Sequence, residues 1–183
     1  MKKDYISTYT KIHFTPTSPR EEDINIEDIA HALSFLCRAN GHIKHFYSVA
    51  QHSIQCCLEA NARGYSKRVQ LACLLHDGSE AYISDITRPV KQFLAEYKTI
   101  EKRLQQAIFR TYFKKELTSE ELSLVREIDD HVLYFEFYAL AGEYLPIQKA
   151  YLMYPANYSQ KAFEEVKKHF LTLFHTLHSQ LSQ

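Results

Sequence analysis

Residues that break helices and segments that could span a membrane are scarce in this sequence. Its 183 residues include only 4 glycines and 5 prolines, which argues against a turn-rich all-β fold and favours long helices. No apolar run approaches the roughly 20 residues of a bilayer span, and the polar start does not resemble a secretory signal peptide. We therefore expect one globular domain over residues 1–183, in the cytoplasm and without contact to a membrane.

The sequence also lacks a net charge and paired cysteines. Lys and Arg number 22, as do Asp and Glu, so there is no bulk positive field to hold a nucleic-acid polymer, and an anionic ligand must be bound locally. The cysteines do not form the C-x-x-C motif of zinc ribbons or thioredoxin-like sites. We interpret all four as small buried hydrophobic residues: Cys37, Cys56, Cys57 and Cys73.

Helical periodicity extends over most of the chain. It predicts an all-α fold, a bundle of about six helices with a short extended arm at residues 4–24. Thr118 and Glu121 form a capping box, and Ser159 or Asn157 is expected to cap the last helix. The predicted helices cover about residues 25–40, 46–62, 66–80, 90–113, 119–141 and 160–180.

Two polar residues occupy the buried stripe of the third predicted helix. His76 and Asp77 stand where apolar side chains are expected, and taking an unpaired carboxylate out of water costs several kcal/mol. They therefore need a partner. A divalent cation would serve, because imidazole and carboxylate are both good metal ligands. A buried His–Asp hydrogen bond is the alternative interpretation.

The apolar faces of two other helices carry further candidate ligands. His52 lies on the buried stripe of the second predicted helix, and an antiparallel neighbour would place it opposite His76. Asp129 follows Val125 by four residues and is expected to point inward, whereas Asp130 is rotated by roughly 100° toward the flank. We predict Asp129 as a ligand, with Asp130 as the alternative. The Glu-x-x-His motifs of di-iron bundles and the H-E-x-x-H motif of zincins are absent.

The order His52, His76–Asp77, Asp129 resembles the HD-domain metal-dependent phosphohydrolase superfamily, an all-α family named for its H…HD…D ligand set. The segments RANGHIKHFYSVAQHS, LLHDGSEAYISDITRPVK and EIDDHVLYFE are similar to its 5′-deoxynucleotidase-like branch, within a matching region of about residues 25–140. The resemblance implies a helical bundle around one divalent ion held by these four residues. Mn, Co, Fe, Ni, Zn and Mg all remain candidates for that ion.

Two further acidic residues are candidates for proton transfer. Glu80 follows His76 by about one helical turn and is expected to face the same pocket, where it would orient a water molecule or carry its proton. Asp85 begins the next loop. The resemblance places Asp85 in the site, either as proton donor to the leaving oxygen or as a contact to a hydroxyl group.

Substrate phosphate needs positively charged donors beyond the metal. Arg38 fits as a fork-shaped phosphate clamp and matches an arginine of the similar enzymes; otherwise it is a cation at a helix C-terminus. Lys91, in the segment RPVK, is a second candidate, and His42 is expected to line the entrance. Ala39 stands where the branch commonly has an aromatic residue, so a ribonucleotide or a larger substrate is an alternative.

The sequence thus predicts a metal-dependent 5′-nucleotidase that releases phosphate from (deoxy)nucleoside 5′-monophosphates. One alternative is a hydrolase of (deoxy)nucleoside triphosphates or of another small phosphoester. The other is a regulatory module that binds nucleotides without turnover. The resemblance and the aromatic residues of the 119–141 helix further predict a homodimer: Tyr134, Phe135, Phe137 and Tyr138.

Overall fold

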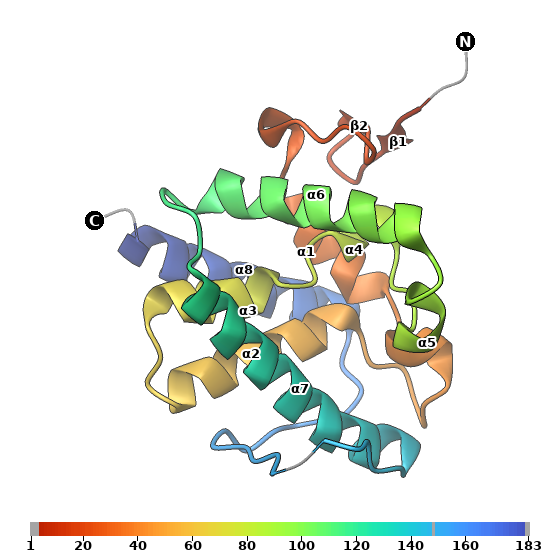
Figure 1. The fold of residues 1–183 in the computed structure, drawn as a ribbon, viewed down its shortest axis with the longest axis vertical. Helices are drawn as coiled ribbons and strands as arrows, with labels where there is room; N and C mark the ends of the chain where they lie inside the picture. Colours follow the sequence, from red (N-terminus) through yellow and green to blue (C-terminus); the bar gives the residue numbers. More distant parts are fainter. Residues whose placement is uncertain (1–3, 148, 182–183) are drawn as a thin grey trace.

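The computed structural model describes residues 4–147 and 149–181, which form a helical bundle with a small N-terminal hairpin (Figure 1). Met1 to Lys3, part of the polar start, lie outside the described residues. Among the described residues no helix is long and apolar enough to cross a membrane. The helices are α1 (Ile26–Phe35), α2 (Val49–Ala62), α3 (Lys67–Leu75), α4 (Glu80–Ile83), α5 (Arg88–Lys91), α6 (Ala95–Tyr112), α7 (Ser119–Ala141) and α8 (Phe163–Leu181).

The predicted all-α bundle of about six helices is confirmed. Six of the described helices have nine or more residues, while α4 and α5 have four each. Helix α2 lies at the centre and packs against α1, α3, α7 and α8. A capping box starts it, because Ser48 accepts a hydrogen bond from the Gln51 N–H and the Gln51 side chain accepts one from the Ser48 N–H. Because four helices surround α2, its polar residues are buried along with its apolar ones.

The third predicted helix is interrupted where the candidate ligands lie. Helix α3 ends at Leu75 and α4 begins at Glu80. Glycine suits position 78 in the break, because a Cβ there would lie 3.0 Å from the Leu75 carbonyl oxygen and 3.3 Å from a methyl carbon of Ile108 in α6. The Gln105 side chain, also from α6, donates to the Leu75 carbonyl at 2.8 Å and accepts from the N–H of the residue before α4 at 3.0 Å. Helix α6 therefore replaces hydrogen bonds that a continuous helix would make itself.

Other predicted boundaries are also corrected. The first helix ends at Phe35 instead of continuing to about residue 40, and the chain then forms a β-bridge between Cys37 and Ser48. The 3₁₀-helix η2 (Arg38–Gly41) lies within this loop. The predicted helix over 90–113 is divided into α5 and α6.

The last helix begins later than expected. Because α8 starts at Phe163, neither Asn157 nor Ser159 caps it. Asn157 instead accepts a hydrogen bond from the Ser159 N–H within the preceding loop. Such a short-range bond competes with helix formation, since Asn side chains readily bind a backbone N–H two residues on.

The N-terminal arm is tied to the bundle. Strands β1 (Ile6–Ser7) and β2 (His13–Phe14) form an antiparallel hairpin in which Ile6 pairs with Phe14, and the 3₁₀-helix η1 (Glu21–Asp23) follows. Asp28 of α1 accepts hydrogen bonds from the Thr10 N–H at 2.7 Å and the Thr10 hydroxyl at 2.8 Å. Phe14 is fully buried and stacks on Tyr82 of α4. The extended arm predicted at residues 4–24 therefore contributes to the core.

A pH-dependent contribution to stability is expected where α7 begins. Hydrogen bonds from Arg68 of α3 and from the Thr118 N–H hold the pKa of Glu121 below its ordinary value of 4.5. A lowered pKa in the folded state means that the stabilisation is present above 4.5 and is lost as the pH falls through the folded-state pKa. Glu121→Gln should lower the free energy of unfolding by about 1 kcal/mol at neutral pH. Urea unfolding should show this difference shrinking in acid, and a difference independent of pH would contradict the assignment.

Candidate metal and active site

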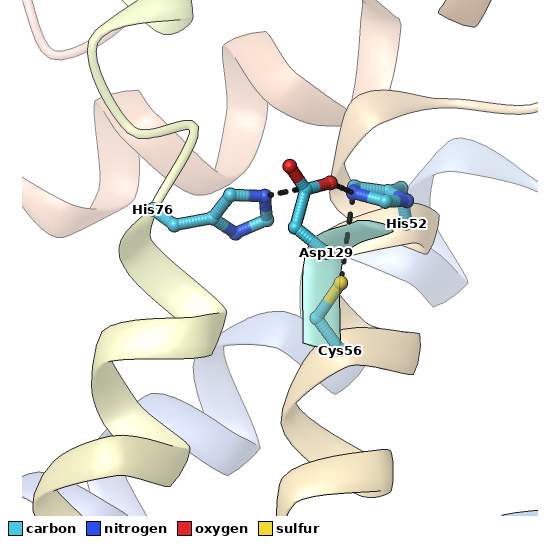
Figure 2. Close-up of side chains that lie close together, drawn as sticks. All are labelled: His52, Cys56, His76 and Asp129. Atoms are coloured by element: carbon cyan, nitrogen blue, oxygen red, sulfur yellow. Dashed lines mark hydrogen bonds and ion pairs between the residues drawn. The ribbon is translucent and has the colours of Figure 1, made fainter. Parts of the chain in front are cut away.

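Four side chains meet between α2, α3 and α7 (Figure 2). His52 and Cys56 come from α2, His76 follows the last residue of α3, and Asp129 comes from α7. One potential ligand atom of each lies within 4.8 Å of every other. The two imidazole rings lie close together, with centroids 5.3 Å apart and their planes tilted by 58°. We call these four residues the ligand cluster.

Hydrogen bonds fix how the two imidazole rings are oriented. His52 Nδ1 lies 2.9 Å from Glu136 Oε2, and His76 Nδ1 lies 2.7 Å from the carbonyl oxygen of Cys73. Both partners are acceptors, so each Nδ1 carries a hydrogen and donates it. In the neutral rings the lone pair is therefore on Nε2. The two Nε2 atoms converge on Asp129 Oδ1, at 3.0 Å from His52 and 3.7 Å from His76.

A ring nitrogen that faces carboxylate oxygens is stabilised by a positive charge between them, either a proton or a metal ion. His76 Nε2 is buried and makes no hydrogen bond to any described residue, although Asp77 Oδ2 lies 3.3 Å away. Burial lowers the pKa of His76, but Asp77 and Asp129 outweigh it and raise this pKa to about 9. The same field attracts a divalent ion, and the mixed nitrogen and oxygen donors suit one. The residues present therefore fit a metal ion.

Asp129 is held in its ionised form by the same two rings. Burial raises its pKa, but the imidazoles of His52 and His76 outweigh burial and hold the pKa well below its ordinary value. Burial and Arg38 lower the pKa of His52, whereas Glu136 and Asp129 outweigh them and raise it. The cluster is thus electrostatically coupled, and each group favours the charge on the next.

The two adjacent aspartates of α7 differ in direction. Asp129 belongs to the ligand cluster, whereas Asp130 does not. Arg88, at the start of α5, bridges them: one guanidinium nitrogen lies 3.0 Å from Asp129 Oδ2 and the other 3.0 Å from Asp130 Oδ1. The geometry favours Asp129 over Asp130, and ligation by Asp129 stays a prediction. Sequence reasoning did not select Arg88, whose only signal was its place beside Pro89.

The cysteines fit the sequence interpretation only in part. Cys57 and Cys73 are buried as expected, whereas Cys37 is partly exposed. Cys56 is buried too, but its sulfur lies 3.5 Å from His52 Nε2, within the ligand cluster. Burial raises the pKa of the Cys56 thiol, and Asp129 adds to this effect. Cys56 is therefore a further candidate ligand. Its spacing of four residues from His52 on one helix was the signal that sequence reasoning overlooked.

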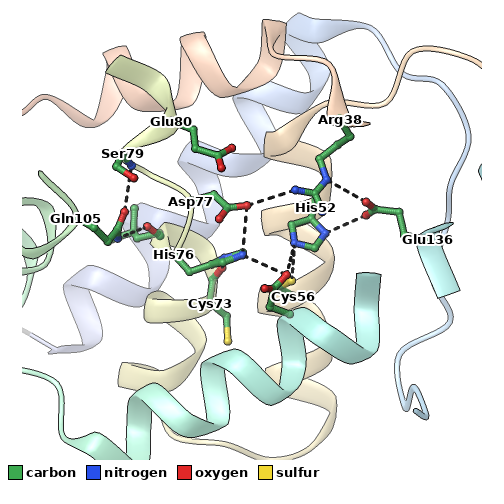
Figure 3. A network of polar contacts seen from close by, with 12 residues as sticks. Arg38, His52, Cys56, Cys73, His76, Asp77, Ser79, Glu80, Gln105 and Glu136 are labelled. Atoms are coloured by element: carbon green, nitrogen blue, oxygen red, sulfur yellow. Dashed lines mark hydrogen bonds and ion pairs between the residues drawn. The ribbon is translucent and has the colours of Figure 1, made fainter. Parts of the chain in front are cut away.

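Glu80 lies near the ligand cluster and is a buried carboxyl group (Figure 3). Its side chain is only 5% exposed, and Oε2 makes no hydrogen bond to any described residue. Burial raises the pKa of Glu80 well above its ordinary value, and the charges of Asp77 and Asp85 add to the effect. Lys91 Nζ lies 3.7 Å from Glu80 and 2.6 Å from Glu101. The fold thus brings Glu80 and Lys91 into one charged group, with half-buried Asp85 nearby.

Arg38 lies in η2 and is nearly buried. Its Nε donates to Glu136 Oε1 at 3.0 Å, and Nη1 lies 3.5 Å from Asp77 Oδ2 (Figure 3). Glu136 was missed by sequence reasoning, although it follows Asp129 by seven residues and therefore shares its helix face. His42, at the end of η2, is exposed and does not belong to the ligand cluster.

A sequence comparison identifies the family of this chain. The sequence model described as the HD domain matches residues 36–142, more than half of the chain. The chain belongs to the HD-domain family. HD domains bind divalent metals, and a cluster that could hold one is present here. Both histidines of the ligand cluster and Asp129 lie inside the matched region.

Two curated relatives have similar sequences. Uncharacterized protein YfdR of Escherichia coli K12 is 38% identical over 108 residues, which are 59% of this chain and 58% of that protein. Uncharacterized protein RCAP_rcc00048 of Rhodobacter capsulatus is 41% identical over 96 residues, 49% of this chain and 48% of that protein. The similarity therefore spans about half of each relative.

A matched pair of variants tests which aspartate contributes to metal binding. Asp129→Asn and Asp130→Asn each remove one carboxylate and one contact to Arg88. We expect Asp129→Asn to weaken the affinity for Mn²⁺ or Co²⁺ by at least about tenfold. Mutating a residue that only supports a metal ligand already lowers metal affinity by about that factor. Asp130→Asn should bind metal as the wild type does. Isothermal titration measures both, and an equal loss in the two variants would contradict the assignment.

Proposed function

We propose that this chain is a metal-dependent 5′-nucleotidase that hydrolyses (deoxy)nucleoside 5′-monophosphates in the cytoplasm. The observation that carries the proposal is the convergence of two imidazole Nε2 atoms on Asp129, with buried Glu80 and nearly buried Arg38 beside them. The choice of nucleotides rests on the resemblance of three segments to the 5′-deoxynucleotidase-like branch. The family membership supports the phosphohydrolase chemistry.

We assign the metal to His52, His76, Asp77 and Asp129. When bound, a divalent ion polarises a phosphoryl oxygen and lowers the pKa of a water molecule, the chemistry that phosphoester hydrolysis needs. Asp77 is well placed as a ligand because its Oδ2 lies between His76 Nε2 and Arg38 Nη1, at 3.3 and 3.5 Å. These contacts limit its rotation and so prepare its orientation for an ion. This donor set accommodates Mn, Co, Fe, Ni, Zn or Mg.

Glu80 is assigned to proton transfer. Burial raises its pKa, so its carboxyl group retains a proton at pH values where exposed carboxyl groups have lost theirs. A positioned carboxyl group with a raised pKa is suited to hold and return a proton. Its Oε2 atom, which has no hydrogen-bond partner among the described residues, is available to a water molecule or to substrate. Asp85 would act on the sugar side, as proton donor to the leaving oxygen or as a hydroxyl contact.

The substrate phosphate would be held by Arg38 and Lys91. The Arg38 guanidinium approaches Asp77 while its Nε is fixed by Glu136, so its fork is oriented before substrate binds. Lys91 brings a second positive charge to within 3.7 Å of Glu80. Of the predicted contacts, exposed His42 would act only at the entrance.

A triphosphate substrate is the second candidate. Arg88 supports it, because this side chain is 61% exposed and lies against Asp129 at the edge of the site. A third cation in this position suits a substrate with more than one phosphate. The small side chain of Ala39 would also leave more room than the aromatic residue common in the similar enzymes. Turnover of triphosphates in preference to monophosphates would decide for this candidate.

We further propose that the protein is a homodimer. Aromatic side chains gather at the end of α7, where Tyr138 is exposed and stacks on Tyr144 with ring centroids 4.2 Å apart. Tyr134 contacts both Phe135 and Tyr144. Exposed aromatic residues of this kind are enriched at protein interfaces, and closed dimers are the commonest soluble assemblies.

The activity test starts from metal-depleted protein. Mn²⁺, Co²⁺, Mg²⁺, Fe²⁺, Ni²⁺ or Zn²⁺ is restored singly, and the release of phosphate, pyrophosphate and tripolyphosphate is measured on 5′-deoxy- and ribonucleotide mono- and triphosphates. We expect phosphate from monophosphates, and its loss in Asp77→Ala. Metal-dependent activity that survives Asp77→Ala would refute the site. Nucleotide binding without turnover would instead favour a regulatory module.

The role of Glu80 is tested by neutralising it without changing its shape. Glu80→Gln should lower kcat by about a hundredfold or more, the usual contribution of a positioned acid or base, with metal affinity unchanged. The control is Glu101→Gln, because Glu101 contacts the same lysine but lies outside the ligand cluster. Steady-state kinetics and metal titration separate the effects. A Glu80→Gln enzyme with wild-type kcat would show that Glu80 carries no proton.

A further inference from the structure

Glu136 is a buried carboxylate that uses each of its oxygens for a different partner. Oε2 accepts from His52 Nδ1 at 2.9 Å, and Oε1 accepts from Arg38 Nε at 3.0 Å (Figure 3). The residue is only 3% exposed and follows Asp129 on α7 by about two helical turns. One helix therefore supplies a side chain to each nitrogen of the His52 ring.

Only an ionised carboxylate satisfies both partners at once. His52 Nδ1–H and Arg38 Nε–H are both donors, so the group between them must present two acceptors. A glutamine in the same place would turn an NH₂ group toward one of the two donors. Burying the carboxylate is costly, but the positive Arg38 compensates it. Burial raises the pKa of Glu136, and Arg38 and His52 outweigh burial and lower it.

The two contacts have different consequences for the site. By accepting from Nδ1, Glu136 fixes the His52 tautomer that leaves the Nε2 lone pair directed at Asp129. By accepting from Nε, it fixes the direction of the Arg38 fork, whose Nη1 then lies 3.5 Å from Asp77. A metal ligand and a phosphate-binding group thus share one support.

We propose that Glu136 is a positioning residue that couples the two halves of the site, so that metal affinity and phosphate affinity both depend on this one carboxylate. The inference rests on the metal site of the proposed function, although not on the identity of its nucleotide. It assigns no direct contact between Glu136 and either ligand. Its effect is transmitted through His52 and Arg38.

The test compares Glu136→Gln with a matched buried glutamate. Glu59, on the same helix α2 as His52, is 1% exposed and accepts from Arg63 Nε at 2.7 Å and from the backbone N–H of Met153 and Tyr154. It follows His52 by seven residues but lies outside the ligand cluster. Glu59→Gln therefore controls for the general effect of neutralising a buried, arginine-paired carboxylate.

Titrations with Co²⁺, and with inorganic phosphate on the Co²⁺-loaded proteins, give the readout. Glu136→Gln should lose about tenfold to a hundredfold in metal affinity, bind phosphate more weakly and show an altered Co²⁺ absorption spectrum. Glu59→Gln should lower the thermal unfolding midpoint while both affinities stay at the wild-type value. Wild-type affinities in Glu136→Gln would refute the coupling alone. A wild type that binds no metal would refute the metal site as well.

A measurement on the wild type keeps the inference testable should Glu136→Gln fail to fold. Long-range ¹H–¹⁵N NMR spectra of the Zn²⁺-loaded protein report which nitrogen of each histidine carries hydrogen. We expect His52 to be protonated on Nδ1 and coordinated through Nε2. Coordination through Nδ1 would refute the role of Glu136, because that nitrogen could not then donate to the carboxylate.

Discussion

The structure depends on placing a charged carboxylate, Asp129, between the buried imidazole ring of His52 and the nearly buried ring of His76. Removing such a charge from water is unfavourable unless opposite charge and hydrogen bonds surround it. His52 and His76 provide both, and they reach Asp129 only because α2, α3 and α7 pack around one point. The packing of these helices and the formation of the site therefore depend on each other. A shift of any of the three helices would leave a buried polar group without its hydrogen-bond or charge partner.

Charge alternates outward from this point. Asp129 is followed by His52, then Glu136, then Arg38, and Arg38 returns to Asp77 beside His76. Every neighbour in this ring favours the charged form of the next, which explains why the histidine pKa values rise despite burial while those of Asp129 and Glu136 fall. Glu80 lies outside this alternation, near other carboxylates. The surroundings of the site thus lower the pKa of Asp129 and Glu136 but raise that of Glu80.

Local sequence signals predicted what local interactions determine. The capping box of Thr118 and Glu121 marked the start of α7, and the apolar stripe of α2 placed His52 in the interior. The break before Glu80 could not be read from the sequence, because it depends on Gln105 of α6, a residue 30 positions from its partner Leu75. The contacts of Glu136 were equally hidden, since His52 lies 84 positions away. Arg88 was missed because no rule of spacing distinguishes it from an ordinary surface residue, whereas the position of Cys56 four residues after His52 was a usable signal.

The part of the chain that must fold together is larger than the segment that identifies its family. The HD-domain match begins at residue 36 and ends at residue 142. Helices α1 and α8 lie outside it, yet α8 packs on α2 and α3, and Phe14 of the arm stacks on Tyr82 in the same short helix as Glu80. A protein trimmed to the family boundaries would expose the inner faces of α2 and α3 to water and leave the helix of Glu80 unsupported. The segment that identifies the family carries the candidate site residues, and the flanking residues complete the packing around the helices that hold them.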